Sequence, residues 1–184
     1  MFVLKKDSFL SMLILGCVIF AVISKVGAQI SHVSLFDDKL ESSISNKRVL
    51  MVKNGEKISK FRIVDLEKLP LYEVFLPPVW ENEAGKYQGV LLSDILKASE
   101  MADVDKVKLV ALGGYAIDLA LSMWPANCLF VATRHQMHEI RVKMKGPIRL
   151  LLPCMIKEED GETNYTEMST ASWIWNLKEI HVLD

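Results

Sequence analysis

The stretch Tyr87-Gln88-Gly89-Val90-Leu91-Leu92-Ser93-Asp94-Ile95-Leu96 contains the clearest helix start of the chain. A loop is predicted over residues 79–89, and the helix is predicted to open at Ser93, whose hydroxyl can cap the free N–H groups. Asp94 suits the positive end of the helix dipole. The apolar face that this helix is expected to bury is supplied by Ile95, Leu96 and Ala98.

Short apolar segments surround this helix on both sides. Their hydrophobic patterns predict strands over residues 49–52, 58–63, 71–76, 106–112, 115–119, 129–133, 140–144, 148–153 and 179–182. Asn54-Gly55 predicts a hairpin turn between the first two strands, because this pair tolerates the positive φ that such turns require. Many short strands with few helices predict the α+β class: a mainly β domain with mixed sheets and a few short helices.

The composition fits one domain of ordinary size. The chain has 184 residues, a formal net charge of −1, 51% apolar residues and 24% charged residues. The apolar content excludes wholesale disorder, and the charge balance lacks the basic excess on which nucleic-acid binding depends. No P-loop, GxGxxG, HExxH or GxSxG motif occurs in the sequence, so NTPase, dinucleotide-binding, zincin and hydrolase functions are not favoured.

Residues 1–28 have the pattern of a secretory signal peptide. Lys5-Lys6 precedes an apolar run over residues 9–23, and Val26 and Ala28 suit the cleavage pocket. The run is short for a membrane-spanning helix, which needs roughly 20 apolar residues. Cleavage after Ala28 is therefore predicted, and it would deliver an exported protein.

Two alternatives for this segment stay open. Leu15-Gly16-Cys17 resembles a lipoprotein box, although the chain continues apolar after it, and the segment can also be retained as an uncleaved anchor. Downstream, residues 29–47 are predicted to form a polar N-terminal arm, and residues 48–184 the domain.

Cys128 and Cys154 both lie in apolar, strand-like runs. In an oxidising compartment they can form a disulfide, and they can equally remain as buried free thiols. The sequence leaves both alternatives open.

The only histidine cluster is His135-Gln136-Met137-His138-Glu139. Its spacing could place both imidazoles on one side of a helix, where a metal would need a third ligand such as Glu139. The strand predicted over residues 140–144 instead favours a hairpin tip, so solvated turn residues are the preferred interpretation.

Aromatic and cationic residues suggest a ligand site. Trp80 lies in a loop, Tyr115 follows a double glycine, and Lys145-Gly146-Pro147-Ile148-Arg149 places two cations around a turn. A flat ligand rich in hydrogen-bonding groups would need such rings for stacking and such cations for its oxygens. The plain alternative is that the aromatic residues belong to the core and that Arg149 pairs with a carboxylate.

Four motifs in order resemble the oxidoreductase molybdopterin-binding family, which has the sulfite-oxidase-like fold. Residues 87–96 are similar to its F-x-G-V-x-L-x-D-L-L run, and residues 107–115 to its strand ending in a D-G-Y or N-D-Y turn. Residues 145–153 are similar to its K-G-P strand, and residues 172–180 to its closing R-W-V-W-x-L-x-x-I segment. The resemblance covers residues 48 to 182 and implies the sulfite-oxidase-like fold.

Departures from the family pattern shape what this resemblance implies. Family enzymes hold molybdenum through a cysteine thiolate before the G-V-x-L helix, and residues 72–89 contain no cysteine. The acid of the family turn is replaced by Gly113 or Gly114, and its D-G-K hairpin by residues 134–138. The resemblance therefore implies a pterin ligand without molybdenum. Because the thiolate is missing, it also favours a chain that is not an enzyme.

The chain is similar to the small exported branch of the family without this cysteine. Members of that branch resemble periplasmic pterin-binding proteins that report to a membrane-bound cyclic-di-GMP synthase or phosphodiesterase. The expected ligand-binding residues are Trp80, Tyr115, Lys145, Arg149, Ser172 and Trp173, with no catalytic residue and no metal. A molybdopterin-dependent oxidoreductase and a ligand-free interaction module are the alternatives.

Overall fold

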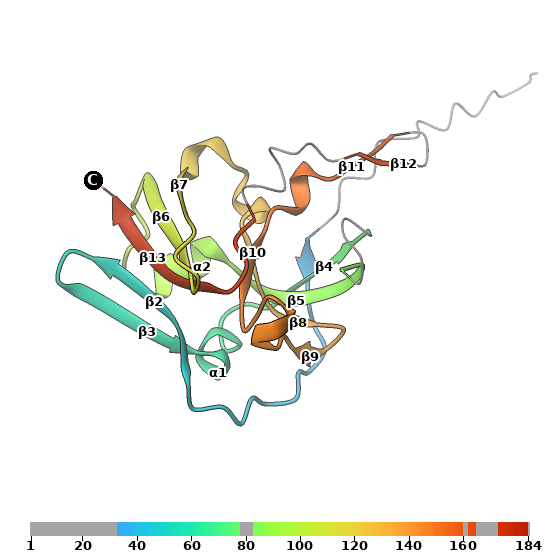
Figure 1. Cartoon of the computed structure of the whole chain (residues 1–184), viewed down its shortest axis with the longest axis horizontal. Helices are drawn as coiled ribbons and strands as arrows, with labels where there is room; N and C mark the ends of the chain where they lie inside the picture. The colour runs from blue at the N-terminus through green and yellow to red at the C-terminus, as the bar shows by residue number, and fades with distance from the viewer. Residues whose placement is uncertain (1–32, 78–82, 160–161, 165–172, 184) are drawn as a thin grey trace, which may run out of the picture.

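A computed structural model describes residues 33–77, 83–159, 162–164 and 173–183. The predicted signal peptide, residues 1–28, lies outside the described residues. The described part of the N-terminal arm holds a two-residue strand, β1 (Ser34–Leu35), and otherwise runs without regular structure to residue 47. The domain that follows is mainly β with a few short helices, as the α+β prediction requires (Figure 1).

The first sheet contains the central apolar strands. Its order is β1, β4 (Tyr72–Leu76), β5 (Gly85–Leu91), β8 (Phe130–His135) and β10 (Arg149–Leu151), and β9 (His138–Glu139) also pairs with β8. All of these pairings are antiparallel. Strand β8 is buried at five of its six positions because strands cover it on both sides.

The second sheet mixes parallel and antiparallel pairing. Its order is β3 (Lys57–Arg62), β2 (Arg48–Asn54), β13 (Leu177–Leu183), β6 (Lys106–Ala111) and β7 (Ala116–Ala120). Strand β13 runs parallel to β2 and antiparallel to β6, so the last described strand lies in the middle of this sheet. A separate hairpin joins β11 (Lys157–Glu159) and β12 (Glu162–Asn164).

Helices are short throughout the described residues. The α-helices are α1 (Ile63–Leu66) and α2 (Leu92–Ala98), and the 3-10 helices are η1 (Leu121–Met123), η2 (Ala126–Cys128), η3 (Val142–Met144) and η4 (Pro153–Met155). Helix α2 follows β5 without a connecting loop, so the stretch 87–96 is a strand that becomes a helix.

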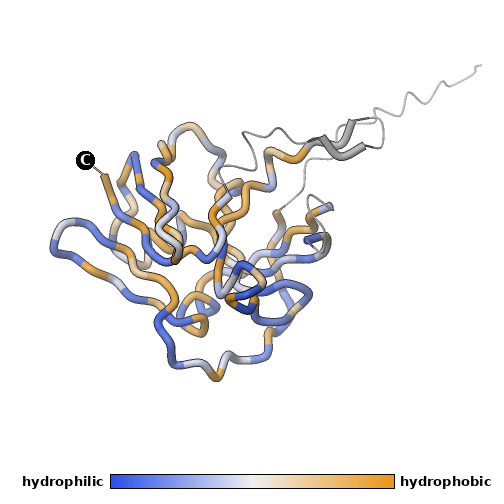
Figure 2. The backbone as a smooth tube through the Cα atoms, in the orientation of Figure 1, coloured by the Kyte–Doolittle hydropathy of each residue, from blue (hydrophilic) through white to orange (hydrophobic). Residues whose placement is uncertain are grey.

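One continuous core joins the two sheets and α2. The inward residues of the second sheet, such as Leu50, Val52, Leu109 and Ile180, belong to the same buried cluster as Phe130 and Leu150 of the first sheet. Figure 2 shows that apolar segments converge between the sheets, whereas most of residues 37–47 of the arm and the tip of the β2–β3 hairpin are hydrophilic. The fold therefore rests on burial of the alternating strands that the sequence predicted.

Turn chemistry confirms one prediction and explains one close approach. Gly55 adopts φ of +55° in the β2–β3 turn, as the Asn-Gly pair indicated. Gly89 lies at a bulge where β5 shifts register against β8, and a Cβ built on it would fall 2.1 Å from the carbonyl oxygen of Val131. A side chain at residue 89 would therefore force these strands apart.

Several local predictions were wrong. The loop predicted over residues 79–89 gives way to β5 from residue 85, because Tyr87 and Gln88 are buried between neighbouring strands. Helix α2 opens at Leu92 with Leu91 as its N-cap and without a side-chain cap, so Ser93 lies inside the first turn.

Two further corrections concern burial. Ala98 is exposed, and Leu92 takes its place on the buried face of α2. Residues 140–144 do not form a strand, and Val142–Met144 form η3 instead. Ile140 is buried, but Val142 and Met144 are 57% and 50% exposed. Because no neighbouring strand among the described residues covers these apolar side chains, the alternating segment does not join a sheet.

The structure decides between the two states of the cysteines. Cys128 at the end of η2 and Cys154 in η4 form a disulfide, with Cα atoms 5.3 Å apart. It joins the segment just before β8 to the segment just after β10. The disulfide therefore closes a loop of the chain that contains β8, β9 and β10.

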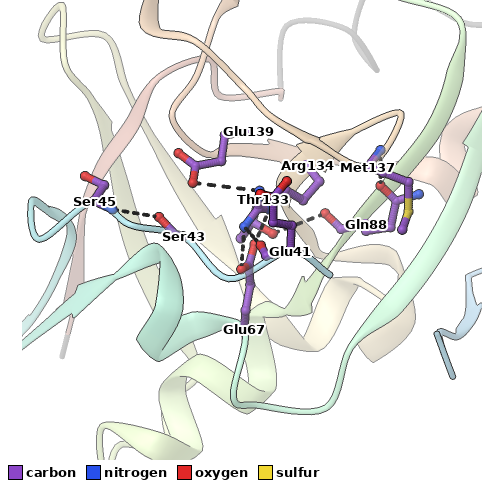
Figure 3. Close-up of polar contacts among 9 residues, drawn as sticks. All are labelled: Glu41, Ser43, Ser45, Glu67, Gln88, Thr133, Arg134, Met137 and Glu139. Carbon is purple, nitrogen blue, oxygen red and sulfur yellow. Dashed lines mark hydrogen bonds and ion pairs between the residues drawn. The ribbon is translucent and has the colours of Figure 1, made fainter. Parts of the chain in front are cut away.

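A buried ion pair fixes the N-terminal arm to the first sheet (Figure 3). Arg134 of β8 is 4% exposed and binds both carboxylate oxygens of Glu67, with Nε–Oε1 and Nη2–Oε2 distances of 2.6 and 2.8 Å. Its Nη2 also donates to the carbonyl oxygen of Glu41 in the arm, and Glu139 lies 3.7 Å from Nη1. The guanidinium therefore joins the arm, the end of α1 and β8.

No helix among residues 33–77, 83–159, 162–164 and 173–183 is long and apolar enough to cross a membrane.

Candidate functional site

Arg149 is the centre of the candidate site. It begins β10, its side chain is 2% exposed, and its Nη1 donates to Oε2 of Glu83. The guanidinium lies over two aromatic rings, with its Cζ atom 4.9 Å from the ring centre of Tyr87 and 5.3 Å from that of Trp175. Cation–π contacts of this kind hold a buried guanidinium plane in a fixed orientation.

Lys145 shares the same carboxylate. Its Nζ lies 2.9 Å from Oε1 of Glu83 and 4.3 Å from the ring centre of Trp175. The backbone of Lys145 is left-handed, with φ of +64°, because η3 ends there. Asn176 stabilises this turn. Its side-chain amide donates to the carbonyl oxygens of Val142 and Gly146, and its backbone N–H donates to the carbonyl oxygen of Lys145.

Glu83 is the acid that the sequence did not reveal. Burial alone would raise the pKa of its carboxyl, but hydrogen bonds from Lys145 and the positive charge of Arg149 lower that pKa below its ordinary value. The carboxylate is therefore ionised at neutral pH. It balances one of the two neighbouring cations and leaves the cluster with a net positive charge.

Tyr87 and His135 form the aromatic side of the cluster. Their rings stack with centres 4.3 Å apart and planes 11° apart, because the two residues are register partners on β5 and β8. The Tyr87 hydroxyl donates to Glu83, with distances of 2.9 Å to its carbonyl oxygen and 3.1 Å to Oε2. Burial and the nearby carboxylate raise the pKa of Tyr87, so the phenol stays protonated and acts as a donor.

A cleft lined by several charged residues opens beside this cluster. It has a volume of about 350 Å³, and its walls come from β8, β9, η3 and β10. The lining residues include three cations, two histidines and two acids: Arg141, Lys143, Arg149, His135, His138, Glu83 and Glu139. Because the cations that line the cleft outnumber the acids, the cleft favours a ligand with acceptor oxygens or negative charge.

One hydrogen-bond donor of Arg149 is unpaired. Its Nε atom is buried and has no hydrogen-bond partner among the described residues. A buried guanidinium N–H without a partner costs free energy in the unliganded protein. An acceptor atom of a bound molecule would recover that free energy.

The structure brings together three of the six predicted ligand residues. Lys145 and Arg149 share Glu83, and Trp173 joins them through an edge-to-face contact with Trp175, with ring centres 5.9 Å apart. Trp173 is 3% exposed and backs the cluster, so it belongs to the core as the plain alternative held.

The other three predicted residues have different outcomes. Trp80 and Ser172 lie outside the described residues. Tyr115 is 52% exposed in the β6–β7 turn, whose Leu112 N–H donates to the carbonyl oxygen of Asn176. This bond places the turn beside the segment that carries Trp175, at the edge of the cluster.

The hairpin position predicted for the two histidines is confirmed, but only His138 is exposed, whereas His135 is half-buried and stacks on Tyr87. His135 and His138 flank a two-residue turn in which Gln136 and Met137 have positive φ, so they belong to the β8–β9 hairpin tip. Among the described residues, no three His, Cys, Asp or Glu side chains are grouped as metal ligands.

The described cysteines do not fit a thiolate-bound molybdenum. Cys128 and Cys154 are bonded to each other, so neither offers a free thiolate, and the region of Tyr72 to Gly89 contains no cysteine. The donors present are a guanidinium, an ammonium and a carboxylate, which suit the edge of an organic ring.

Comparison of the chain with protein-family models finds no match, and comparison with curated proteins finds none either.

Proposed function

We propose that this protein is an exported, non-catalytic pterin-binding protein with the sulfite-oxidase-like fold, and that the pterin binds in the cleft beside Arg149. The observation that carries the proposal is the buried Arg149, with its Nε–H unpaired and its guanidinium held against the rings of Tyr87 and Trp175. A planar ligand with acceptors on one edge complements this arrangement.

Glu83 adds a reason to prefer a pterin over a simple anion. A pterin edge carries a carbonyl oxygen beside an N–H and an amino group, so it needs both a donor and an acceptor from the protein. Arg149 offers the donor, and the carboxylate of Glu83 has lone pairs beyond those used by Lys145, Arg149 and Tyr87. The pair therefore complements the pterin edge on both counts.

The signalling role is proposed from the resemblance of the sequence. The protein is expected to act in the periplasm after removal of residues 1–28, and to pass its ligand state to a membrane-bound cyclic-di-GMP synthase or phosphodiesterase. Lys143 and Arg141 line the cleft rim, so a bound ligand would alter the charge that this face presents.

Titration with a tetrahydropterin, followed by tryptophan fluorescence, tests the ligand. We expect saturable quenching, because Trp175 lies beside Arg149. Arg149→Lys keeps the positive charge and removes Nε–H, so we expect affinity to fall roughly 10- to 100-fold. Lys60→Gln on β3 of the second sheet is the matched control and leaves affinity unchanged.

Two results would overturn the proposal. One is the absence of a saturable response, or a response that Arg149→Lys leaves unaltered while circular dichroism shows a folded protein. The other is bound molybdenum near one atom per chain, in protein made by cells that synthesise the cofactor, which would favour the oxidoreductase.

A further inference from the structure

A second cavity lies away from Arg149, against helix α2. Its volume is about 340 Å³, and it lies between α2, η1 and the segment leading to β8. Its walls are mainly apolar: Leu92, Leu96, Val104, Leu121, Trp124 and Leu129. A cavity of this size and lining can enclose an apolar side chain.

Asp94 is the acidic residue that lines this cavity. Its Oδ2 atom is buried and accepts no hydrogen bond from the described residues. Burial raises the pKa of Asp94, whereas the positive charge of Lys97 and the Tyr72 hydroxyl lower it. Burial also raises the pKa of Tyr72, and the charge of Asp94 raises it further.

Lys97 supplies a charge of the opposite sign one helical turn away. Residues at positions i and i+3 lie on the same side of a helix, and Lys97 lines the same cavity as Asp94. Lys97 is exposed, and its positive charge acts on Asp94, whose pKa it lowers. A carboxylate and an ammonium therefore line one mainly apolar cavity.

We infer that this cavity binds an apolar α-amino acid, with the ligand ammonium at Asp94, the ligand carboxylate at Lys97 and the ligand side chain against Leu96 and Trp124. The ligand ammonium would pair with the Asp94 carboxylate, one oxygen of which has no donor among the described residues. The positive and negative charges of the ligand would thus face the negative Asp94 and the positive Lys97, which follow one another along α2. This site is separate from the proposed pterin site, since no residue lines both cavities.

A titration followed by 15N–1H NMR of the full chain tests the inference, with L-phenylalanine and two truncated analogues as probes. Phenethylamine lacks the carboxylate and 3-phenylpropionate lacks the ammonium. We expect saturable shifts at the amides of α2 and around Trp124 with L-phenylalanine. The affinity for each analogue is expected to be at least roughly tenfold weaker.

Variants assign each charge of the ligand to its partner. Asp94→Asn is expected to abolish the preference for L-phenylalanine over 3-phenylpropionate, and Lys97→Gln the preference over phenethylamine. Asp118→Asn on β7, an exposed carboxylate, is the matched control and keeps both preferences. Ala102→Leu fills the cavity from its rim without touching Asp94 and is expected to weaken all three probes.

Three outcomes would overturn the inference: no saturable shift with L-phenylalanine, equal affinity for L-phenylalanine and an analogue, or preferences that survive Asp94→Asn and Lys97→Gln. If Asp94→Asn fails to fold, Ala102→Leu decides, because unchanged binding would place the ligand elsewhere. Arg149→Lys is expected to leave these affinities unaltered. Failure of the pterin site would therefore not count against the amino-acid site.

Discussion

Two buried arginines on neighbouring elements of the first sheet differ in how fully they are paired. Arg134 of β8 is 4% exposed, Arg149 of β10 is 2% exposed, and each contacts a glutamate. Arg134 binds both oxygens of Glu67 and also a backbone carbonyl of the arm. Arg149 uses one nitrogen for Glu83, and its Nε has no partner among the described residues.

The difference follows from which side of β5 each arginine faces. Gln88 is the register partner of Arg134, whereas Arg149 lies over the ring of Tyr87. Tyr87 and Gln88 are successive strand residues, so they point to opposite faces of the sheet. One face is closed by the arm and α1, and the other opens into the cleft. Full pairing is what we expect of a structural arginine, and the incomplete pairing of Arg149 is what the proposed binding role requires.

The largest expected effect compares neutral variants of the two arginines. Arg134→Met leaves Glu67 buried without its cation, so we expect the free energy of unfolding to fall by about 3–5 kcal/mol. Arg149→Met leaves Glu83 with Lys145 and Tyr87, and the expected loss is about 1–3 kcal/mol. Urea unfolding measures both losses.

The double variant Glu67→Gln/Arg134→Met serves as the control for this comparison. It removes the unpaired charge together with the cation, so it is expected to recover part of the stability lost by Arg134→Met. Equal losses for the two single variants would show that pairing does not distinguish the two arginines.

The next effect concerns the disulfide that spans both arginine strands. Cys128 and Cys154 are separated by 26 residues, so Cys128→Ser/Cys154→Ser is expected to lower stability by about 3 kcal/mol. The bond lies outside the cleft, and ligand affinity of the folded double variant is therefore expected to stay within about twofold. Urea unfolding and a tetrahydropterin titration measure the two quantities. A loss of affinity without a loss of stability would contradict this division.

The smallest effect is the share of the acid pH dependence that comes from Glu83, to which Asp65, Glu73 and Glu179 also contribute because their pKa values are lowered too. The folded-state pKa of Glu83 lies below the ordinary value of 4.5, so its pairing contributes stability above that pH, and the contribution fades as the pH falls through the lower folded-state pKa. Glu83→Gln is expected to flatten this part of the acid limb, measured by urea unfolding from pH 6 to about 3. Glu100→Gln is the control for an exposed ion pair: Lys57 also lowers the pKa of Glu100, but solvent screens that pair, so the flattening is expected to be smaller. Equal flattening by both variants would refute a special role for Glu83.

Local patterns predicted most of the strands correctly. The β2–β3 hairpin follows from Asn54-Gly55 and from alternation on both sides, because turn geometry and hydrophobic period are encoded within a few residues. The β8–β9 hairpin tip was predicted from a strand expected over residues 140–144, but the strand that returns is His138–Glu139. Residues 140–144 show the limit of such patterns, because their alternation is the same whether or not a neighbouring strand is present to bury them.

The candidate site was predicted only in part. Lys145 and Arg149 were found because a cation on each side of a turn is visible in the sequence. Glu83 and Tyr87 were missed, since the carboxylate that pairs with Arg149 lies 66 residues away and the strand carrying Tyr87 was interpreted as a loop. Only burial distinguishes that strand from a polar loop.

The sequence by itself determined the class of this protein: a mainly β domain with a signal-like leader, short helices and a pair of cations near one turn. Those features depend on propensity and on hydrophobic period, which act over neighbouring residues. Tertiary structure decided the disulfide, the pairing of each arginine and the position of Asp94 at an apolar cavity. Each of these depends on residues far apart in the chain, whose approach is set by how the two sheets bury their apolar faces.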